Sequence, residues 1–154
     1  MSLKGVIVMK KILCLLVLLL SLTATCAAFN PPQPPRWFWV GSGAHYGAWI
    51  DTATARFYTG SEKYAHRNHQ CALVWVEWYD ADKDEYEISH DEYDFDCRLM
   101  RTLSATFYNS QNRVIDSYNR SYADFEDIIP GTNGEMVYDA VALLKETREN
   151  ARRL

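Results

Sequence analysis

The chain has 154 residues, of which 20 are acidic, 16 are basic and 21 are aromatic. Its formal charge of −4 at pH 7 makes nucleic acid and anionic lipid poor candidates for the main partner. The aromatic content argues against a disordered chain, and the length is enough for one domain with a real core.

The N-terminal segment has the three parts of a secretory signal peptide. A short basic segment is followed by the apolar run 12–20 and then by small residues. The apolar run is too short for a stable membrane span. We therefore predict a signal peptide over residues 1–28, with its natural start at Met9 and cleavage near Ala27 or Ala28.

This signal peptide predicts a protein that works outside the cytoplasm: in the periplasm, at the cell surface or outer membrane, or secreted. Beyond residue 28 the chain has 13 basic and 20 acidic residues, a net charge of −7. Cys26 offers an alternative, as the lipid-bearing first residue of a bacterial lipoprotein. Thr23 and Thr25 fit the lipoprotein signal poorly, so ordinary cleavage is favoured. Membrane attachment is expected only if Cys26 is lipidated.

A proline-rich spacer is predicted over residues 29–36, followed by one domain over 37–154. Most of this domain consists of strand patterns rich in aromatic and β-branched residues. Strands are expected at 37–40, 46–51, 71–79, 86–93, 98–108 and 113–118, with a short strand or turn within 52–70. Segment 71–79 is apolar on both faces, so it should lie near the centre of a sheet with cover on each side.

Segment 98–108 alternates between apolar and polar residues, as a half-buried antiparallel strand does. Its expected inward residues are Leu99, Leu103, Ala105 and Phe107. We expect Leu99, Leu103 and Phe107 to pack against the C-terminal helix. We also expect Trp75 and Phe107 to be core residues.

The C-terminal segment predicts a helix. Thr132 and Glu135 form a capping-box pattern just after a break at Gly131. The helix then carries an apolar stripe made of Met136, Val137, Ala140, Val141, Leu143 and Leu144. The sequence therefore predicts an α+β fold: a small antiparallel β-sheet of about six strands packed against one C-terminal α-helix.

Two clusters contain residue types that bind metals. His66, His69 and Cys71 offer two imidazoles and a thiol within six residues, and zinc-like metals prefer such ligands. No second cluster of matching spacing accompanies them, so we favour a solvated loop. The acidic segment 80–85 resembles the start of a calcium loop, but it has Glu85 where such a loop needs glycine. We favour a charged hairpin turn there and expect no metal or cofactor.

The sequence contains no recognisable catalytic motif. It has no Gly-x-Ser-x-Gly, and no Ser or Cys in a familiar catalytic setting. An acidic strand that contains His90, Asp91 and Asp94 could supply paired carboxylates for a hydrolase. A solvated face is the favoured interpretation, so we expect a protein that is not an enzyme. Exposed aromatic and Arg side chains suggest protein contacts, and a sheet edge could pair with a second copy.

Two cysteines remain in the domain, Cys71 and Cys97, and two thiols in an oxidising compartment usually pair. If the strands on either side of the 80–85 turn pair, Cys71 lies opposite the region just before Cys97. A Cys71–Cys97 disulfide is therefore possible if the two cysteines come within bonding reach.

A set of short segments follows one another along the domain. They are Trp37-Phe38-Trp39-Val40, Ala48-Trp49-Ile50-Asp51, Leu73-Val74-Trp75-Val76, Asp96-Cys97-Arg98, Phe107-Tyr108-Asn109-Ser110, Val114-Ile115, and Ile129-Pro130-Gly131 leading to Glu135. In this order the set resembles the surface-adhesin protein E-like family of bacterial envelope proteins. The resemblance implies an antiparallel sheet with a C-terminal helix, binding of host extracellular-matrix or serum proteins, and no enzymatic activity.

The chain departs from this family in two places, at one cysteine and in its degenerate lipoprotein signal. The resemblance implies a bond between Cys97 and a cysteine in the C-terminal helix, but segment 137–141 contains none. Either Cys71 is a relocated partner or Cys97 is free. The function expected from all these features is an exported, non-enzymatic, adhesin-like protein-binding domain. The alternative is a periplasmic structural or accessory protein that docks to an envelope partner.

Overall fold

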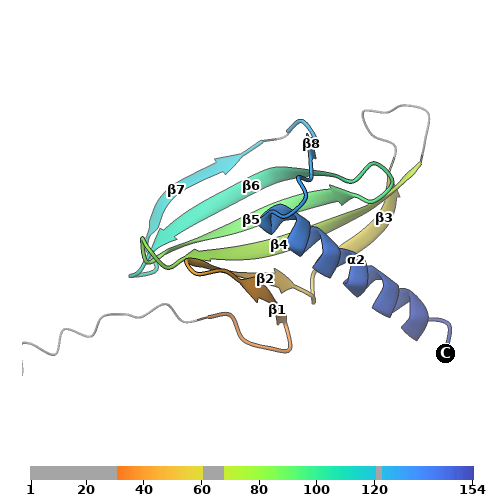
Figure 1. Cartoon of the computed structure of the whole chain (residues 1–154), viewed down its shortest axis with the longest axis horizontal. Helices are drawn as coiled ribbons and strands as arrows, with labels where there is room; N and C mark the ends of the chain where they lie inside the picture. The colour runs from red at the N-terminus through yellow and green to blue at the C-terminus, as the bar shows by residue number, and fades with distance from the viewer. Residues whose placement is uncertain (1–30, 61–67, 121–122) are drawn as a thin grey trace, which may run out of the picture.

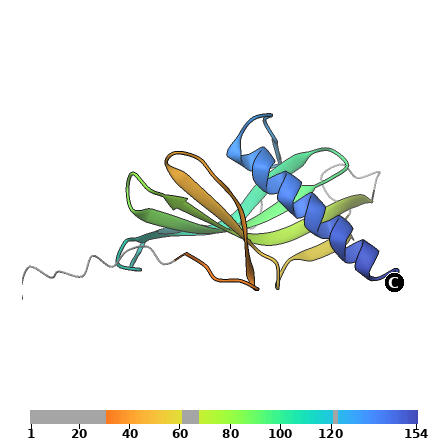
Figure 2. The ribbon, with the colours of Figure 1, turned by 60° about the horizontal axis from the view of Figure 1, so that its bottom comes forward.

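The structure is a computed structural model that describes residues 31–60, 68–120 and 123–154. It contains one antiparallel sheet, with helix α2 (Asn133–Ala151) lying across one face (Figure 1). The helix crosses the sheet obliquely (Figure 2). This arrangement confirms the predicted α+β fold class. Among the described residues no helix is both long enough and apolar enough to cross a membrane.

The sheet follows the order of the chain, with two short strands added at its margins. Its main path is β1 (Trp37–Ser42), β2 (Tyr46–Asp51), β4 (His69–Asp80), β5 (Glu85–Asp94), β6 (Leu99–Asn109) and β7 (Val114–Asn119). The short strands β3 (Arg56–Gly60) and β8 (Glu126–Asp127) pair with β4 and β6. All pairs are antiparallel, and β4 lies between β2 and β5, near the centre as predicted.

A charged turn joins β4 to β5. The Oδ1 atom of Asp80 accepts hydrogen bonds from the backbone N–H groups of Asp82 and Lys83, at 3.0 and 3.2 Å. Asp84 follows with a left-handed φ of 52°. Asp80 also pairs with the Lys83 ammonium, and Asp82 pairs with His45. The carboxylates of the segment that resembles a calcium loop therefore take part in contacts of the turn. The predicted charged hairpin turn is confirmed.

The start of α2 has the predicted cap. The Thr132 hydroxyl accepts a hydrogen bond from the N–H of Glu135, 3.4 Å away. The Glu135 carboxylate accepts from the N–H of Gly131 at 2.7 Å. Gly131 has φ +77°, a conformation that L side chains rarely adopt, so glycine allows the chain to turn sharply into the helix.

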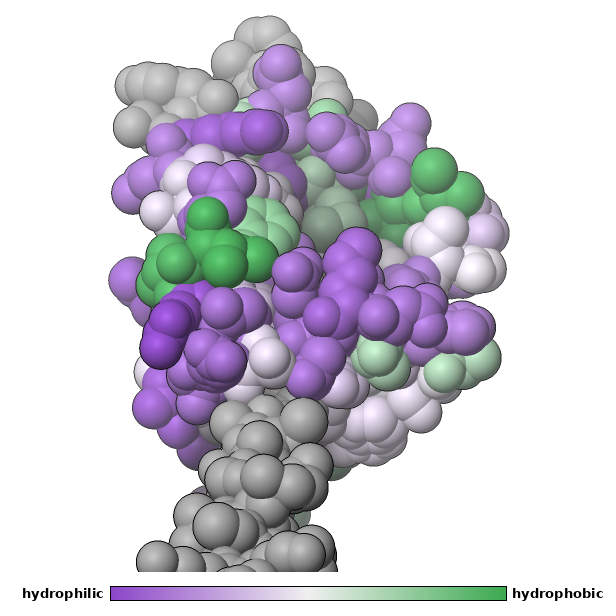
Figure 3. Space-filling view, turned by 90° about the vertical axis from the view of Figure 1, so that its left-hand side faces the viewer, coloured by the Kyte–Doolittle hydropathy of each residue, from purple (hydrophilic) through white to green (hydrophobic). Residues whose placement is uncertain are grey.

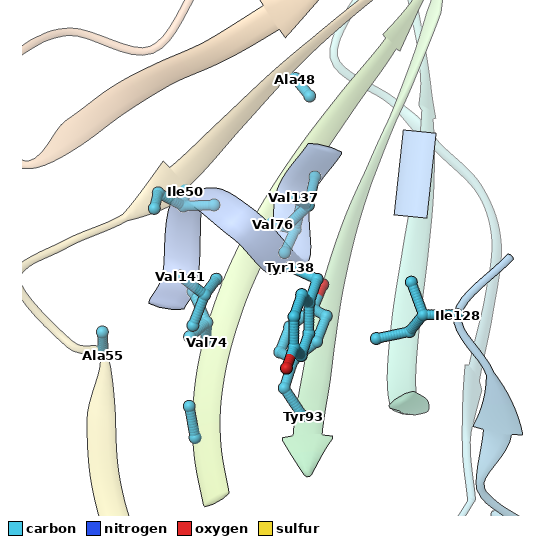
Figure 4. Close-up of a cluster of buried hydrophobic side chains, with 11 residues drawn as sticks. Ala48, Ile50, Ala55, Val74, Val76, Tyr93, Ile128, Val137, Tyr138 and Val141 are labelled. Carbon is cyan, nitrogen blue, oxygen red and sulfur yellow. The ribbon is translucent and has the colours of Figure 1, made fainter. Parts of the chain in front are cut away.

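The core lies between α2 and the strands around β4. Val137, Tyr138 and Val141 point from the helix toward the sheet (Figure 4). Their buried neighbours on the strands are Ala48, Ile50, Ala72, Val74, Val76 and Tyr93. The helix contacts β1 and β2 directly. Its apolar stripe therefore covers the part of the sheet that is built from small aliphatic side chains.

The predicted helix partners on β6 are wrong. The register of β5 with β6 shifts between His90 and Asp91. His90 pairs with Ser104 and Asp91 pairs with Thr102, so Leu103 forms a bulge between the two pairs. Leu99 lies opposite Asp94, on the face turned away from α2. A bulge moves later side chains to the other face. The apolar residues of β6 therefore do not form one continuous inward stripe.

The face of the sheet that is turned away from α2, here called the open face, also differs from expectation. Leu73 and Trp75 point away from α2 and are only half-buried, and Trp75 stacks on His90 with ring centroids 4.4 Å apart. Phe107, the other expected core aromatic, is half-buried as well. In the described ranges no further helix or sheet covers this open face. Within the described residues α2 covers one side of β4, and cover of the whole second side stays a prediction.

The last part of the predicted spacer is attached to the domain. Arg36 donates to Oδ2 of the fully buried Asp51 from Nε and Nη2, at 2.9 and 2.7 Å. The N–H of Thr52 donates to the Arg36 carbonyl at 2.8 Å. Arg36, the last residue of the predicted spacer, is therefore bound to β2 and to the residue that follows it.

Two adjacent leucines on α2 test the packing of the helix. Leu144 packs against the core, whereas the Leu143 side chain is 60% exposed. We predict that Leu144→Ala lowers the free energy of unfolding by about 2 kcal/mol, since it removes half-buried methyl groups and leaves a void. Leu143→Ala should change it by less than about 0.5 kcal/mol. Urea denaturation compares the two, and equal losses would mean that α2 does not pack as described.

Candidate functional site

Strand β1 carries two exposed aromatic side chains. Within the described residues it forms one end of the sheet and pairs with β2 alone. Phe38 is 55% exposed and Trp39 is 46% exposed. Because successive residues of a strand point to opposite faces, these two side chains flank the edge on its two sides.

A shallow apolar groove lies beside this edge. Trp39 meets Trp49 edge-on, with ring centroids 4.7 Å apart. A Cβ at Gly47 would come within 2.8 Å of the Trp49 ring, so glycine lets that ring lie flat against β2. The groove has a volume of about 320 Å³, and its lining includes Pro31, Trp39, Tyr46, Trp49 and Tyr79. We name Phe38, Trp39, Tyr46 and Trp49 the aromatic edge.

Exposed apolar side chains also occur on β7, at the other end of the sheet. Val114 is 59% exposed and Ile115 is 51% exposed. On the side of the molecule shown in Figure 3, hydrophobic side chains gather in separate patches within a mainly hydrophilic surface. Both edges of the sheet thus offer apolar contacts, and β1 combines them with exposed aromatic rings and a mainly apolar groove.

A second cluster lies where β4 begins and β5 ends. Nδ1 of His69 is 2.5 Å from Oδ2 of Asp94 and 3.7 Å from Sγ of Cys97. The three donor atoms all lie within 4.8 Å of one another. His69 and Asp94 are buried, whereas Cys97 is exposed. We name His69, Asp94 and Cys97 the His–Asp–Cys cluster.

Backbone hydrogen bonds hold this cluster in place. Oδ1 of Asp94 accepts from the N–H groups of Asp96 and Cys97, at 2.9 and 3.0 Å. Oδ2 of Asp96 accepts from the N–H of Gln70 at 2.6 Å. The N–H of Phe95 donates to the Gln70 carbonyl at 2.9 Å. The turn after β5 is thereby fixed against the start of β4, which brings Cys97 back toward His69.

The cluster does not have the geometry of a nucleophilic triad. In such a triad the nucleophile and the carboxylate contact different nitrogens of the imidazole, so that a proton passes through the ring. Here Asp94 and Cys97 both approach Nδ1 of His69. Both contacts fall on one nitrogen, so the arrangement is not that of a proton relay.

The sequence identified only part of this cluster. His69 is a buried strand residue, so the expected solvated loop is wrong at that position, and His66 lies outside the described residues. The thiol beside His69 is that of Cys97, and not that of Cys71, which the sequence offered as a candidate ligand. Asp94 was expected only within an acidic strand. The residues that meet are separated by 25 and 28 positions, so local spacing gave no signal.

Both domain cysteines are free thiols in the structure. Cys71 pairs in register with Asp94, which confirms that it lies opposite the region just before Cys97. Burial raises the pKa of the Cys71 thiol to about 11, and the nearby Asp94 and Glu92 carboxylates add to the increase. The possible Cys71–Cys97 disulfide is not formed here, because Cys97 lies beyond the end of β5, in the turn held by Asp94.

A buried ion pair lies next to the cluster. Nε of Arg101 donates to Oε2 of Glu92 at 2.6 Å, and Nη2 lies 2.5 Å from the same oxygen. The Tyr58 hydroxyl donates to Oε1 of Glu92. The Arg101 guanidinium also lies over the Phe125 ring, 4.4 Å from its centroid, and donates to the Ala123 carbonyl. These contacts join β3, β5 and β6 to the segment that precedes β8.

The candidate hydrolase residues do not form a common site. Asp91 faces the α2 side, where its side chain contacts the hydroxyls of Ser89 and Tyr93. His90 points to the open face and stacks on Trp75, and burial lowers its pKa. Asp94 belongs to the His–Asp–Cys cluster. The acidic strand is therefore neither the expected solvated face nor a convergent catalytic centre.

Two buried carboxylates have unusual acidities. Burial raises the pKa of Glu77, on the open face, to about 7. Burial also raises the pKa of Asp91 to about 7, although hydrogen bonds from Thr102 and Ser89 oppose the shift. Both groups therefore titrate near neutral pH, but they point to opposite faces of the sheet.

The fold and these sites define an α+β domain with an aromatic strand edge and a separate His–Asp–Cys cluster. Comparison of the chain with protein-family models, curated proteins and solved structures finds no match. The resemblance to the surface-adhesin protein E-like family stays a prediction.

Proposed function

We propose that this chain is an exported, non-enzymatic protein-binding domain of adhesin type, which binds host extracellular-matrix or serum proteins at the bacterial surface. The observation that carries the proposal is the aromatic edge at β1. Aromatic side chains that remain exposed on a folded domain are typical anchors of protein interfaces. The signal-peptide pattern supports export.

The aromatic edge suits an extended segment of a partner protein. An unpaired sheet edge offers backbone donors and acceptors in the right spacing for one more strand. Phe38 and Trp39 lie on opposite sides of that edge, so an added strand would have an aromatic contact on each face. The groove beside Trp39 and Trp49 would receive a side chain of the added strand.

The net charge of the domain also restricts the class of partner segment that it can bind. The chain beyond residue 28 has a net charge of −7, so a basic partner segment is favoured and an acidic one repelled. We therefore propose an extended, positively charged segment of an extracellular-matrix or serum protein as the occupant of the β1 edge. Pairing of β1 with a second copy of the chain is the competing outcome, and it would appear as a dimer in size-exclusion chromatography.

The test is a binding screen of the mature domain against purified extracellular-matrix and serum proteins. For each protein that binds, Trp39→Ala and Phe38→Ala should weaken the affinity by about 30-fold, the effect of losing a hot-spot anchor of about 2 kcal/mol. Ile115→Ala removes an equally exposed apolar side chain at the opposite sheet edge and should leave affinity unchanged. Equal affinities for all three variants would contradict the proposed surface.

The alternative function is a periplasmic structural or accessory protein that uses the same edge to dock to an envelope partner. Labelling of intact cells with a membrane-impermeant reagent separates the two locations. A mature protein that is labelled only after cell disruption would support the periplasmic role. In that case the Trp39→Ala variant should lose its partner in a pull-down from envelope extract, while Ile115→Ala should retain it.

A further inference from the structure

The His–Asp–Cys cluster carries an inference that is independent of the aromatic edge. We propose that His69, Asp94 and Cys97 bind one divalent transition-metal ion of the zinc class. Imidazole nitrogen, carboxylate oxygen and thiolate sulfur are all ligands of zinc. These three donors come from two distant parts of the chain and approach one another within 4.8 Å.

The His69–Cys97 distance already fits a tetrahedral metal, whereas the His69–Asp94 pair has to open. With metal–nitrogen and metal–sulfur bonds of ordinary length, the two donor atoms would be about 3.6 Å apart. The observed separation between Nδ1 of His69 and Sγ of Cys97 is 3.7 Å. The same reasoning places nitrogen and oxygen ligands about 3.4 Å apart. The His69–Asp94 contact of 2.5 Å would therefore open by about 1 Å as the metal replaces the shared hydrogen bond.

The surroundings also suit a metal ligand set. The second carboxylate oxygen of Asp94 is held by two backbone N–H groups, which leaves Oδ2 directed at His69. Outer contacts of this kind orient metal ligands in known sites. Asp94 and Asp96 place two carboxylates at this end of the strands, and their negative charge favours a cation. The exposed Cys97 lets water supply a fourth ligand from the solvent side.

A hydrogen bond between His69 and Asp94 is by itself a common structural pair. The position of Cys97 is what distinguishes this cluster. The thiol lies beside the same nitrogen that the carboxylate contacts, although the Cys97 side chain is exposed and could point to solvent. Three donors of the right chemical types within 4.8 Å of one another are the minimum set of protein ligands for an accessible zinc site.

Titration of the purified mature protein with Co²⁺ tests the proposal, because a cobalt–thiolate bond gives charge-transfer absorption in the near ultraviolet. We expect this absorption to saturate at one Co²⁺ per chain and to disappear when Zn²⁺ is added. Cys97→Ser should abolish the absorption and weaken Zn²⁺ binding at least about 100-fold, more than the loss of an outer contact would. The matched control Cys71→Ser should retain both, since Cys71 lies outside the cluster.

Two further measurements test the role of the Asp94 charge and the redox state of the two cysteines. Asp94→Asn keeps an oxygen for the turn but removes the charge, so it should weaken Zn²⁺ binding while the circular dichroism of the domain is unchanged. Intact-mass analysis of the protein without reductant should show two free thiols. A Cys71–Cys97 disulfide, absence of thiolate absorption, or equal losses in the two cysteine variants would overturn the proposal. None of these results depends on whether the aromatic edge binds a protein.

Discussion

Arg101→Met should destabilise the domain by about 3 to 5 kcal/mol, the usual cost of removing one partner from a buried ion pair. Glu92 has only 3% of its side chain exposed, and Arg101 has 12%. Without Arg101, the Glu92 carboxylate would keep the Tyr58 hydroxyl but would lose its neutralising charge. Guanidinium denaturation should detect the change as a lower midpoint with an unaltered slope.

A double variant separates the loss of the ion pair from the loss of packing. Arg101→Met combined with Glu92→Gln removes both charges, so much of the lost stability should return. Arg113→Met changes the same residue type at the exposed tip of the β6–β7 hairpin and should have an effect within about 0.5 kcal/mol. If the double variant were as unstable as Arg101→Met, the buried charge of Glu92 would not be the cause.

Local patterns were sufficient to predict most of the elements. The charged residues from Asp80 onward predicted the β4–β5 turn because their carboxylates bind the backbone within three residues. Thr132 and Glu135 predicted the helix start for the same reason. Such interactions depend on neighbours in the chain, so the sequence contains the whole signal.

Packing between elements was less predictable. The bulge that places Leu103 between the partners of His90 and Asp91 leaves the strand pattern of β6 intact, so alternation alone could not locate it. The position of α2 depends on which strands carry small aliphatic side chains on one face, and this in turn depends on the register. A correct choice of helix partners therefore required the sheet order and the bulge together.

The candidate sites also divide into features that local patterns predict and features that depend on packing between elements. The aromatic residues of 37–40 predicted a strand, but an edge strand and a central strand share that pattern, so the exposure of Phe38 and Trp39 came only from the sheet order. The His–Asp–Cys cluster could have been approached from the hairpin register, which places Cys71 opposite Asp94. The return of Cys97 toward His69 depends on side-chain hydrogen bonds of Asp94, which the register does not specify.

The domain should be less stable at pH 8 than at pH 5 because of two buried carboxyl groups. The pKa values of Glu77 and Asp91 are raised from 4.5 and 3.8 to about 7 in the folded state, in both cases chiefly by burial. Between the unfolded pKa and the folded pKa of each group, the folded state holds a proton that the unfolded state has released. The resulting stabilisation is complete below the unfolded pKa and is lost as the pH rises through about 7.

Removal of either charge should flatten this dependence. Relative to the wild type, each of the variants Glu77→Gln and Asp91→Asn should gain about 2 to 3 kcal/mol more at pH 8 than at pH 5. Glu146→Gln, on the exposed side of α2, should follow the wild-type profile. Urea denaturation at the two pH values provides the comparison. A gain of the same size at both pH values would mean that the amide packs better than the acid, and the buried charges would then not account for the pH dependence.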